Sequence, residues 1–393
     1  MTFVIRGLGT AVPPLAMAQN DAGTLFFSFA EPAGGRERTL QALFRKSGVK
    51  KRHSVLLERE DGPLSRRQSF YHPARDASDQ GPPTSVRMAR YEKEAPALAV
   101  TAAERALEEA NTDPAAITHL VTVSCTGFFA PGPDSRLIET LGLPRSVERT
   151  HVGFMGCHGA MNGLRVGASH TGANPHARVL VCAVELCSLH VAYGWDPEDL
   201  VANAIFGDGA AAAVGRPALP EEIGALGGGE EGIPGSGAAP GGGPIPAPGS
   251  AETPWTITAN GTFLIPDSRE AMSWRIGDHG FRMTLSPRVP DLIRAHLKSW
   301  LEGWLAREGV ALEEVASWAI HPGGPRILGA VEEALALERS ETEVAREVLA
   351  QHGNMSSPTI LFILKEMRAR KVARPLVALA FGPGLVVEAV LIR

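Results

Sequence analysis

The chain has 393 residues, of which 44% are apolar, and a formal net charge of -5. That size allows one large or two medium-sized globular domains with a substantial core. Because the charges are interspersed and slightly acidic in sum, they exclude nucleic acid as an expected main partner. The sequence shows neither a membrane span nor a secretory signal, so we expect a soluble cytoplasmic protein.

The elements of the first half are predicted from apolar periodicity and turn residues. Residues 1–10 predict a short strand and turn, and the Arg- and Pro-rich stretch 53–87 predicts an irregular covering loop. Then follow a helix at 101–110, a strand at 119–124, a helix at 134–141, a glycine-rich turn and helix from about 153, a buried strand at 178–184, and a turn and strand at 206–214.

Residues 217–253 consist largely of Gly, Pro and small or acidic residues. Such a stretch cannot fill a core or sustain a ladder of backbone hydrogen bonds. We therefore expect a flexible insertion between two halves, residues 1–216 and 254–393.

The second half repeats the order of the first. Its patterns predict a helix at 292–307, a strand at 315–320, a loop at 321–324, a helix at 326–337, a helix opened by residues 353–359, a strand at 375–379 and a turn at 381–384. The repetition predicts an α/β fold of two pseudo-symmetric halves.

The four cysteines are too few and too scattered for a secreted disulfide framework, so we expect free thiols in a reducing compartment. Cys182 and Cys187 lie in or just after an apolar strand pattern, where we expect inert small hydrophobes. For Cys125 the sequence leaves a packing role and a cavity-lining role open.

Cys157 is different, because glycines at 153, 156 and 159 place it in a hinged turn that runs into a helix. A helix N-terminus stabilises a thiolate, so we expect a lowered thiol pKa and a nucleophile. The glycines would let a substrate approach closely. The alternative is a cysteine that only fills space.

When the two halves are superposed, Asn354 takes the place of Cys157, and His321 ends the strand that matches residues 121–124. Strand ends at the join of two such halves favour a site, so we expect the three residues to converge. Singly, His321 is as well explained by a loop-stabilising role and Asn354 by a helix cap. Only together do they favour catalysis.

These three residue types suit one chemistry in particular. A thiolate attacks a thioester and holds the acyl group, with a nearby histidine keeping it ionised. Histidine and asparagine donors aimed at one carbonyl oxygen stabilise the enolate that forms when a malonyl group loses carbon dioxide. We expect no metal ion and no organic cofactor.

Five ordered motifs resemble those of the type III polyketide synthases, and the resemblance covers nearly the whole chain. They are Gly-Cys-His-Gly at 156–159, Phe-Gly-Asp-Gly-Ala at 206–210, Ile-His-Pro-Gly-Gly at 320–324, Gly-Asn-Met-Ser-Ser at 353–357 and Phe-Gly-Pro-Gly-Leu at 381–385. The resemblance implies a thiolase-like fold with αβαβα layers. It also implies a catalytic triad of Cys157, His321 and Asn354 acting on coenzyme A (CoA) thioesters.

The resemblance further assigns cavity positions. Phe206 matches a gatekeeper phenylalanine, although an ordinary core aromatic is the alternative, and Met283 stands where plant enzymes have a second gatekeeper phenylalanine. Cys125 and Thr126 fall where the family lines its cavity. The loop that carries Phe381 and Gly382 begins with alanine rather than the family's glycine.

The basic residues Arg45, Lys46, Lys50, Lys51 and Arg52 lie near the family's contacts to CoA phosphates, and cations suit that role. A merely solvated charged face is the alternative. The family forms homodimers in which a loop methionine enters the partner's cavity. We expect a homodimer here too, although alanine 130 replaces that methionine.

The sequence therefore predicts an enzyme that condenses an acyl-CoA starter with malonyl-CoA and cyclises the product to a pyrone or phenolic ring. Met283 and the small cavity residues favour an aliphatic starter. The alternatives are a condensing enzyme resembling ketoacyl-ACP synthase III, which takes malonyl groups from acyl carrier protein, a Cys-His-Asn hydrolase, and a catalytically silent scaffold.

Overall fold

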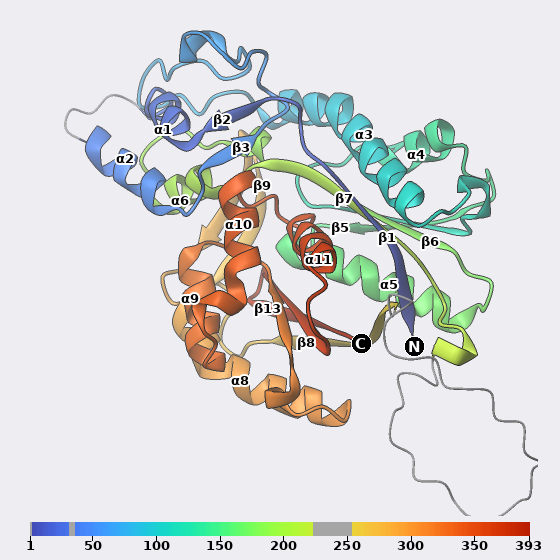
Figure 1. The fold of residues 1–393 in the computed structure, drawn as a ribbon. Coiled ribbons are helices and arrows are strands. Elements are labelled where there is room, and N and C mark those ends of the chain that lie inside the picture. Colours follow the sequence, from blue (N-terminus) through green and yellow to red (C-terminus); the bar gives the residue numbers. More distant parts are fainter. Residues whose placement is uncertain (1, 31–35, 223–253) are drawn as a thin grey trace, which may run out of the picture.

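The computed structural model describes residues 2–30, 36–222 and 254–393 of the chain. In these residues nine strands form one sheet, and two further pairs form small sheets (Figure 1). The large sheet contains β1 (Phe3–Ala11), β4 (His119–Ser124), β5 (Glu148–Gly153), β6 (Val179–Leu186), β7 (Asp208–Arg216), β8 (Trp255–Leu264), β11 (Ser317–Ile320), β12 (Leu376–Gly382) and β13 (Val386–Ile392). The small sheets pair β2 (Ala16–Ala18) with β3 (Lys51–His53), and β9 (Met272–Gly277) with β10 (Gly280–Leu285).

The strand order of the large sheet shows the duplication directly. The order is β11-β12-β13-β8-β1-β7-β6-β4-β5, so β1 is followed outward by β7, β6 and β4, and β8 is followed by β13, β12 and β11. Corresponding pairs of strands run in the same relative direction in the two halves. The pairs β4–β6 and β11–β12 are both parallel, and the pairs β6–β7 and β12–β13 are both antiparallel. The two halves meet where β1 pairs with β8, and the predicted pseudo-symmetry is confirmed.

Helices cover and separate the two halves of the sheet. They are α1 (Gln19–Phe27), α2 (Glu37–Lys46), α3 (Thr84–Glu109), α4 (Pro133–Leu141), α5 (Gly159–Ala173), α6 (Pro197–Ile205), α8 (Val289–Arg307), α9 (Pro325–Leu335), α10 (Glu343–His352) and α11 (Thr359–Ala369). Helices α5 and α11 contact each other and strands of both halves, so they form the central layer (Figure 1). Helix α3 covers β1, β6 and β7 from one outer face, and α8 packs with α9 on the other. The layers therefore alternate as predicted.

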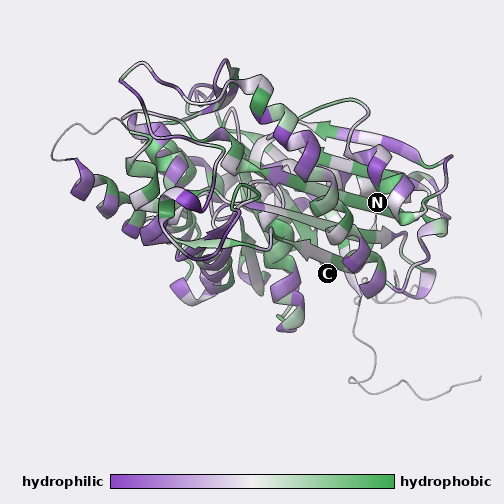
Figure 2. Ribbon diagram, turned by 90° about the horizontal axis from the view of Figure 1, so that it is seen from above, coloured by the Kyte–Doolittle hydropathy of each residue, from purple (hydrophilic) through white to green (hydrophobic). Residues whose placement is uncertain are grey.

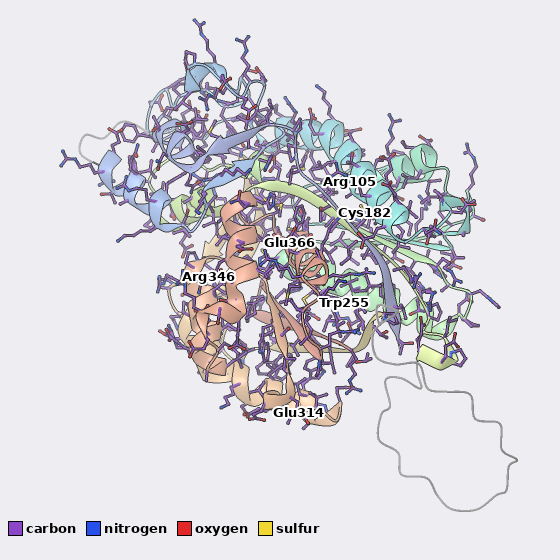
Figure 3. The ribbon with its side chains drawn as sticks, in the orientation of Figure 1. Arg105, Cys182, Trp255, Glu314, Arg346 and Glu366 are labelled. Carbon is purple, nitrogen blue, oxygen red and sulfur yellow. The ribbon has the colours of Figure 1, made fainter. Side chains whose placement is uncertain are left out.

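Close packing of α5 depends on small residues. At Gly163 a Cβ atom would lie only 2.8 Å from Val123 of β4 and 2.9 Å from Val181 of β6, so glycine lets the helix approach the sheet. Apolar residues concentrate along the strands, and polar residues on the outer turns of the helices (Figure 2). Cys182 packs beneath α3, where its thiol lies 3.6 Å from the carbonyl oxygen of Ala99, whereas Arg105 and Glu314 lie toward the outside (Figure 3).

The long helix α3 differs most from the sequence prediction. The helix expected at 101–110 is the last part of α3, which begins at Thr84 and continues through Pro96. Proline removes a backbone donor and usually interrupts a helix, which hid the first half of α3 in the sequence. The region 53–87 is irregular as expected, apart from the last residue of β3, a short helical turn, Leu64–Arg66, and the start of α3. Most of the expected insertion, residues 223–253, lies outside the described residues.

Candidate active site

Cys157 lies in a single helical turn, Gly156–His158, between β5 and α5. Gly156 has φ of +74°, and a Cβ atom there would overlap the ring of Pro383. The backbone can therefore enter the turn only with glycine at this position. The turn brings the thiol of Cys157 to the wall of an internal cavity.

His321 and Asn354 reach the same cavity from the second half of the chain. His321 directly follows β11, and its backbone N–H donates to the carbonyl oxygen of Leu379 at 2.8 Å. The cavity has a volume of about 30 Å³, and Cys157, His321 and Asn354 all line it. The expected convergence of these three residues is present in the structure.

Asn354 is held by its backbone and by its side chain. It forms an isolated parallel bridge with Phe206, and its side-chain Oδ1 accepts the backbone N–H of Ser356 at 2.8 Å. Helix α11 begins only at Thr359, so Asn354 is not the cap of that helix. Because Oδ1 is used by Ser356, the amide NH₂ is the part of Asn354 available to the cavity.

The protonation state of the site differs from the sequence expectation. Burial raises the pKa of Cys157 to about 11, although hydrogen bonds from Ser356 and Asn354 act in the opposite direction. Burial also lowers the pKa of His321 to about 3, and His158 contributes in the same direction. Desolvation thus outweighs the short helical turn, and the shift runs opposite to the lowered thiol pKa expected from the sequence. Burial therefore favours the neutral form of both the thiol and the imidazole.

A fully buried carboxylate, which the sequence analysis missed, lies behind the cavity. Glu185 of β6 accepts the backbone N–H groups of Cys125 and Thr126 at 2.9 and 3.0 Å, the Thr126 hydroxyl at 2.6 Å and the Ser357 hydroxyl at 2.6 Å. Burial raises the pKa of Glu185, and its charge raises the pKa of Cys157 and Cys125. Glu185 could have been found from the sequence, because it is an acidic residue inside the otherwise apolar run of β6.

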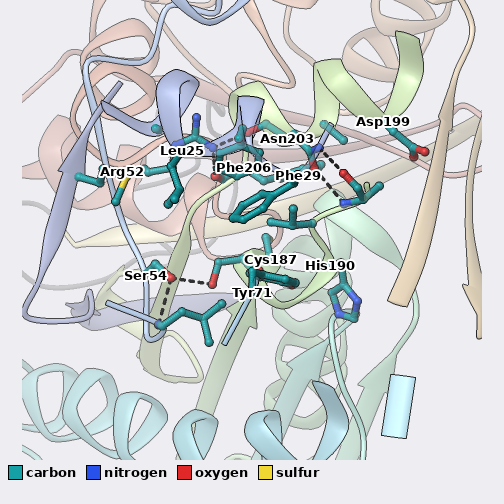
Figure 4. Close-up of a pocket in the computed structure, with 18 of the residues that line it drawn as sticks. Leu25, Phe29, Arg52, Ser54, Tyr71, Cys187, His190, Asp199, Asn203 and Phe206 are labelled. Carbon is teal, nitrogen blue, oxygen red and sulfur yellow. Dashed lines mark hydrogen bonds between the residues drawn. The ribbon is translucent and has the colours of Figure 1, made fainter. Parts of the chain in front are cut away.

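Two more cavities lie beyond the triad cavity. One, of about 40 Å³, is lined by Cys125, Thr126, Cys157 and Cys187, and the next, of about 70 Å³, lies toward α1, β3 and α6 (Figure 4). Cys187 therefore lines both cavities, and burial raises the pKa of its thiol well above the ordinary value, which agrees with the expected inert side chain. The sequence could not show that Cys187 lines a cavity, because this residue begins a short helical turn, Cys187–His190, whose direction is set by tertiary packing.

Three side chains stand where these cavities meet. Phe206 and Met283 line all three cavities, and Trp274 lines the two that lie beyond the thiol. The indole N–H of Trp274 donates to the carbonyl oxygen of Cys125 at 2.7 Å, and the ring lies edge-on to His190 and Phe281. The expected cavity positions of Phe206 and Met283 agree with this arrangement, whereas Trp274 was missed.

A larger groove leads from the surface to the triad. It has a volume of about 920 Å³, with Lys46 and Arg326 among its lining residues. The residues common to the groove and the triad cavity are Ile205, Leu285, Gly323 and Ile327. The groove therefore adjoins the triad cavity along these shared residues.

The basic cluster does not act as one group. Arg45, Lys50 and Lys51 are exposed and do not line the groove. Arg52 is buried, and its guanidinium donates to Gln19 and to the carbonyl oxygens of Asn203 and Phe206. Its pairing in β3 turns this side chain inward, so Arg52 holds the end of α6 and is not a phosphate ligand.

The last two binding residues predicted from the sequence, Phe381 and Gly382, lie at the end of β12. Phe381 lines the triad cavity, whereas Gly382 lies against the ring of His158, and a Cβ atom there would overlap that ring. Within the described part of the chain no group of three or more His, Cys, Asp or Glu residues is placed to hold a metal ion, and no helix is long and apolar enough to cross a membrane.

Comparisons with known proteins agree with this geometry. The model of the N-terminal domain of chalcone and stilbene synthases matches residues 2–217, and that of the C-terminal domain matches residues 256–393. The chain is 32% identical to a 1,3,6,8-tetrahydroxynaphthalene synthase of Streptomyces peucetius subsp. caesius, over 99% of this chain and 92% of that protein. It is 29% identical to an alpha-pyrone synthesis polyketide synthase-like protein of Mycobacterium tuberculosis, over 99% of this chain and 90% of that one.

Solved structures show the same relationship. The crystal structure of PKS-I from the brown alga Ectocarpus siliculosus aligns with a TM-score of 0.85 and 29% identity, covering 100% of this chain and 98% of that one. The type III polyketide synthase domain of Steely1 from Dictyostelium aligns with a TM-score of 0.82 and 26% identity, covering 100% and 99%. The chain therefore belongs to the chalcone and stilbene synthase family of type III polyketide synthases.

Proposed function

We propose that this enzyme loads an acyl group from an acyl-CoA starter onto Cys157 and extends it with malonyl units from malonyl-CoA. The observation that carries the proposal is the cavity at the inner end of a surface groove, in which Cys157, His321 and Asn354 meet. In the loading step the sulfur of Cys157 bonds to the acyl carbon and the C–S bond to CoA breaks. The thiol proton passes through His321 to the departing CoA sulfur.

In the extension step malonyl-CoA enters the same groove. The bond to its carboxylate breaks, carbon dioxide leaves, and the electron pair forms an enolate whose oxygen is held by His321 and the Asn354 amide. The enolate carbon then attacks the acyl group on Cys157, which releases the thiolate. Donors preorganised in a site this buried are worth more than in water, and loss of one typically costs about 100-fold or more in rate.

The groove suits a CoA thioester. Lys46 and Arg326 supply two cations, and the N-terminus of α9 lies on the same wall beside Gly324. Cationic side chains and a helix N-terminus both favour phosphate groups. Asp196 and Glu198 line the groove as well, so we expect the phosphates to lie toward Lys46 and Arg326.

The cavities beyond the thiol favour an apolar starter. Leu25, Phe26, Phe29 and Leu56 line the pocket that adjoins Phe206, so an aliphatic chain bound to Cys157 finds apolar walls there. We propose an aliphatic acyl starter whose extended chain cyclises to a pyrone or phenolic ring. Relatives of this chain include an alpha-pyrone synthesis protein and a tetrahydroxynaphthalene synthase, which supports both ring types.

We also propose that the enzyme is a homodimer. Phe128, Phe154 and Met155 are 53%, 36% and 38% exposed, and they lie close to the Cys157 turn. The rings of Phe128 and Phe154 are 6.4 Å apart and both contact Phe281 of the cavity wall. An exposed aromatic group of this kind favours cover by a second copy. All four cysteines are free, which supports a reducing, cytoplasmic location.

The experiment combines intact-protein mass spectrometry with carbon dioxide release. Incubation with a medium-chain acyl-CoA should add the acyl mass to Cys157, and malonyl-CoA should then release carbon dioxide and yield a cyclised product. Absence of both events would contradict the proposal. Activity with malonyl-ACP but not malonyl-CoA would instead indicate a ketoacyl-ACP synthase. Dialysis against a chelator should leave turnover unchanged, since the proposed chemistry uses no metal ion or organic cofactor.

A further inference from the structure

The residue after the nucleophile, His158, is 2% exposed and carries a hydrogen-bond chain of its own. Its Nδ1 lies 2.7 Å from Oδ1 of Asn162, and Nδ2 of Asn162 donates to Oε1 of Glu388 at 2.9 Å. A carboxylate only accepts, so the amide NH₂ of Asn162 must face Glu388 and its oxygen must face His158. The hydrogen between His158 and Asn162 therefore lies on Nδ1 of His158.

Glu388 anchors this chain in the second half of the molecule. Oε1 of Glu388 also accepts the Thr262 hydroxyl at 2.9 Å, and its Oε2 accepts from Arg165 at 2.9 Å. Thr262 belongs to β8 and Glu388 to β13, whereas Arg165 and Asn162 belong to α5. The orientation of the His158 ring is thus set by contacts from three elements.

The other ring nitrogen of His158 has a free lone pair. Nε2 is buried, and in the described residues it has no hydrogen-bond partner. The ring lies on Gly382 at the end of β12, the strand that runs parallel to β11 and so ends beside His321. Both ring nitrogens of His321 also lack a hydrogen-bond partner within the described residues, and the two imidazoles interact electrostatically. The strand ends thus place an imidazole with an unpaired acceptor near an imidazole with an unpaired N–H, and no hydrogen bond joins the two in the described residues.

We propose that His158 is a positioning residue for His321: its Nε2 comes to accept a hydrogen bond from the imidazole N–H of His321 when His321 takes up the proton of Cys157. This inference rests on the proposed function, in which His321 receives the proton of Cys157. It assigns His158 no contact with substrate, because His158 does not line the triad cavity.

The need for such an acceptor follows from the burial of the pair. Moving the proton from Cys157 to His321 creates a thiolate and an imidazolium where the neutral forms are favoured. Ser356 and Asn354 supply hydrogen bonds to the thiolate. The His158 lone pair supplies the matching hydrogen bond to the imidazolium, as the third member of a nucleophile, base and orienting group arrangement.

His158 can act this way only while it is neutral. Burial lowers its pKa, whereas Asn162 and the charge of Glu388 raise it in part and the charge of Arg165 lowers it. The charged or titratable groups that face it are Arg165 from α5, Glu388 from β13 and His321 after β11. Protonation of Nε2 would remove the acceptor and place a cation beside His321.

The test compares two substitutions of His158 by the rate of Cys157 alkylation. His158→Phe keeps a flat ring but removes the acceptor, and His158→Gln keeps an acceptor oxygen. Iodoacetamide reacts with the thiolate, and peptide mapping reports Cys157 alone, so the assay needs no substrate. At pH 7 we expect His158→Phe to slow alkylation about tenfold or more, and His158→Gln to stay within about threefold of the unmodified enzyme. His176→Phe, which replaces an exposed histidine, should have no effect.

The rate of acyl loading from the starter should rank the variants in the same order as the rate of alkylation. The loss of loading rate in His158→Phe should become smaller as the pH rises toward the pKa of the Cys157 thiol. Equal alkylation rates in His158→Phe and the unmodified enzyme at every pH would overturn the proposal, and so would equal losses in both variants.

Histidine 15N spectra of the unmodified enzyme provide a check that needs no variant. They should show His158 protonated at Nδ1 and bare at Nε2, and the opposite tautomer would refute the proposal. An enzyme that shows these alkylation rates but no decarboxylation would contradict only the proposed function.

Discussion

Phe206 and Asn354 are joined by one backbone bridge. The N–H of Asn354 donates to the carbonyl oxygen of Ile205 at 2.8 Å, and the N–H of Gly207 donates to the carbonyl oxygen of Asn354 at 3.0 Å. A residue that lines all three inner cavities and a residue of the triad therefore form one hydrogen-bonded unit. The shape of the cavity and the aim of the Asn354 amide are coupled.

Gly207→Ala should disturb this unit. A Cβ atom at Gly207 would overlap the backbone carbonyl of His352, which cannot yield as a side chain can. We expect a loss of about 1–3 kcal/mol in the free energy of unfolding, together with a loss of malonyl-CoA decarboxylation that exceeds the loss of acyl loading. Thermal melting and the two activity assays measure these effects. Gly303→Ala is the control, since nothing lies within 4 Å of that Cβ position in α8.

Cys157→Ala should abolish acyl loading. The thiols of Cys125 and Cys187 line the adjoining cavity, but burial raises the pKa of each well above its ordinary value, so neither should replace Cys157. Intact mass after incubation with the starter checks this. Cys125→Ser and Cys187→Ser serve as controls that keep Cys157. An acyl group that persists on either cysteine in Cys157→Ala would contradict the assignment.

Alkylation of Cys157 should depend on pH in a definite direction. Burial favours the neutral thiol and raises its pKa to about 11, so the thiolate fraction and the alkylation rate should still be rising between pH 9 and 11. Ser356→Ala removes a hydrogen bond that lowers this pKa, so its profile should move to higher pH. A profile that levels off by pH 8 in the unmodified enzyme would show a stabilised thiolate instead.

Trp274→Ala should change starter preference. Its indole lies on the wall shared by the two cavities beyond the thiol, so truncation should join them. We expect the ratio of kcat/KM for a long acyl-CoA to that for a short one to rise about tenfold or more, since each added methylene in an apolar pocket is worth about 1–3 kcal/mol. Trp300→Ala is the matched control, because Trp300 packs on Phe263 and Trp304 away from the cavities. An unchanged ratio would show that Trp274 does not determine the starter preference.

Deletion of residues 227–249 should leave turnover largely intact. Strand β7 ends at Arg216 and β8 begins at Trp255, and Val4 of β1 pairs with Arg216 on one side and Thr256 on the other. The two ends are therefore about 10 Å apart, or two strand spacings. The remaining residues, each spanning up to about 3.5 Å, bridge that gap easily. A longer deletion, 227–257, removes partners of β1 and should abolish folding. Loss of activity in the shorter deletion would show instead that residues 227–249 contribute to turnover.

The sequence predicted the parts of this enzyme that depend on local pattern. Strand β4 has the predicted bounds, and the duplicated order placed Cys157, His321 and Asn354 together. The electrostatics could not be predicted in this way, because the pKa of Cys157 depends on burial by segments distant in sequence. Arg52 was misread for the same reason, since a basic run does not show which side chain its strand turns inward.

The position of β1 also matters while the protein is being made. This first strand pairs with β7 on one edge and β8 on the other, and β8 is synthesised only after the long stretch that follows Arg216. At about 5–20 residues per second, residues 217–254 take about 2–8 s to emerge. During that interval the first half of the sheet can assemble, but the backbone N–H and C=O groups on one edge of β1 stay unpaired. Such an edge can form hydrogen bonds with a strand of another chain. The nascent chain is thus most exposed to mispairing with a neighbouring copy just before its second half appears.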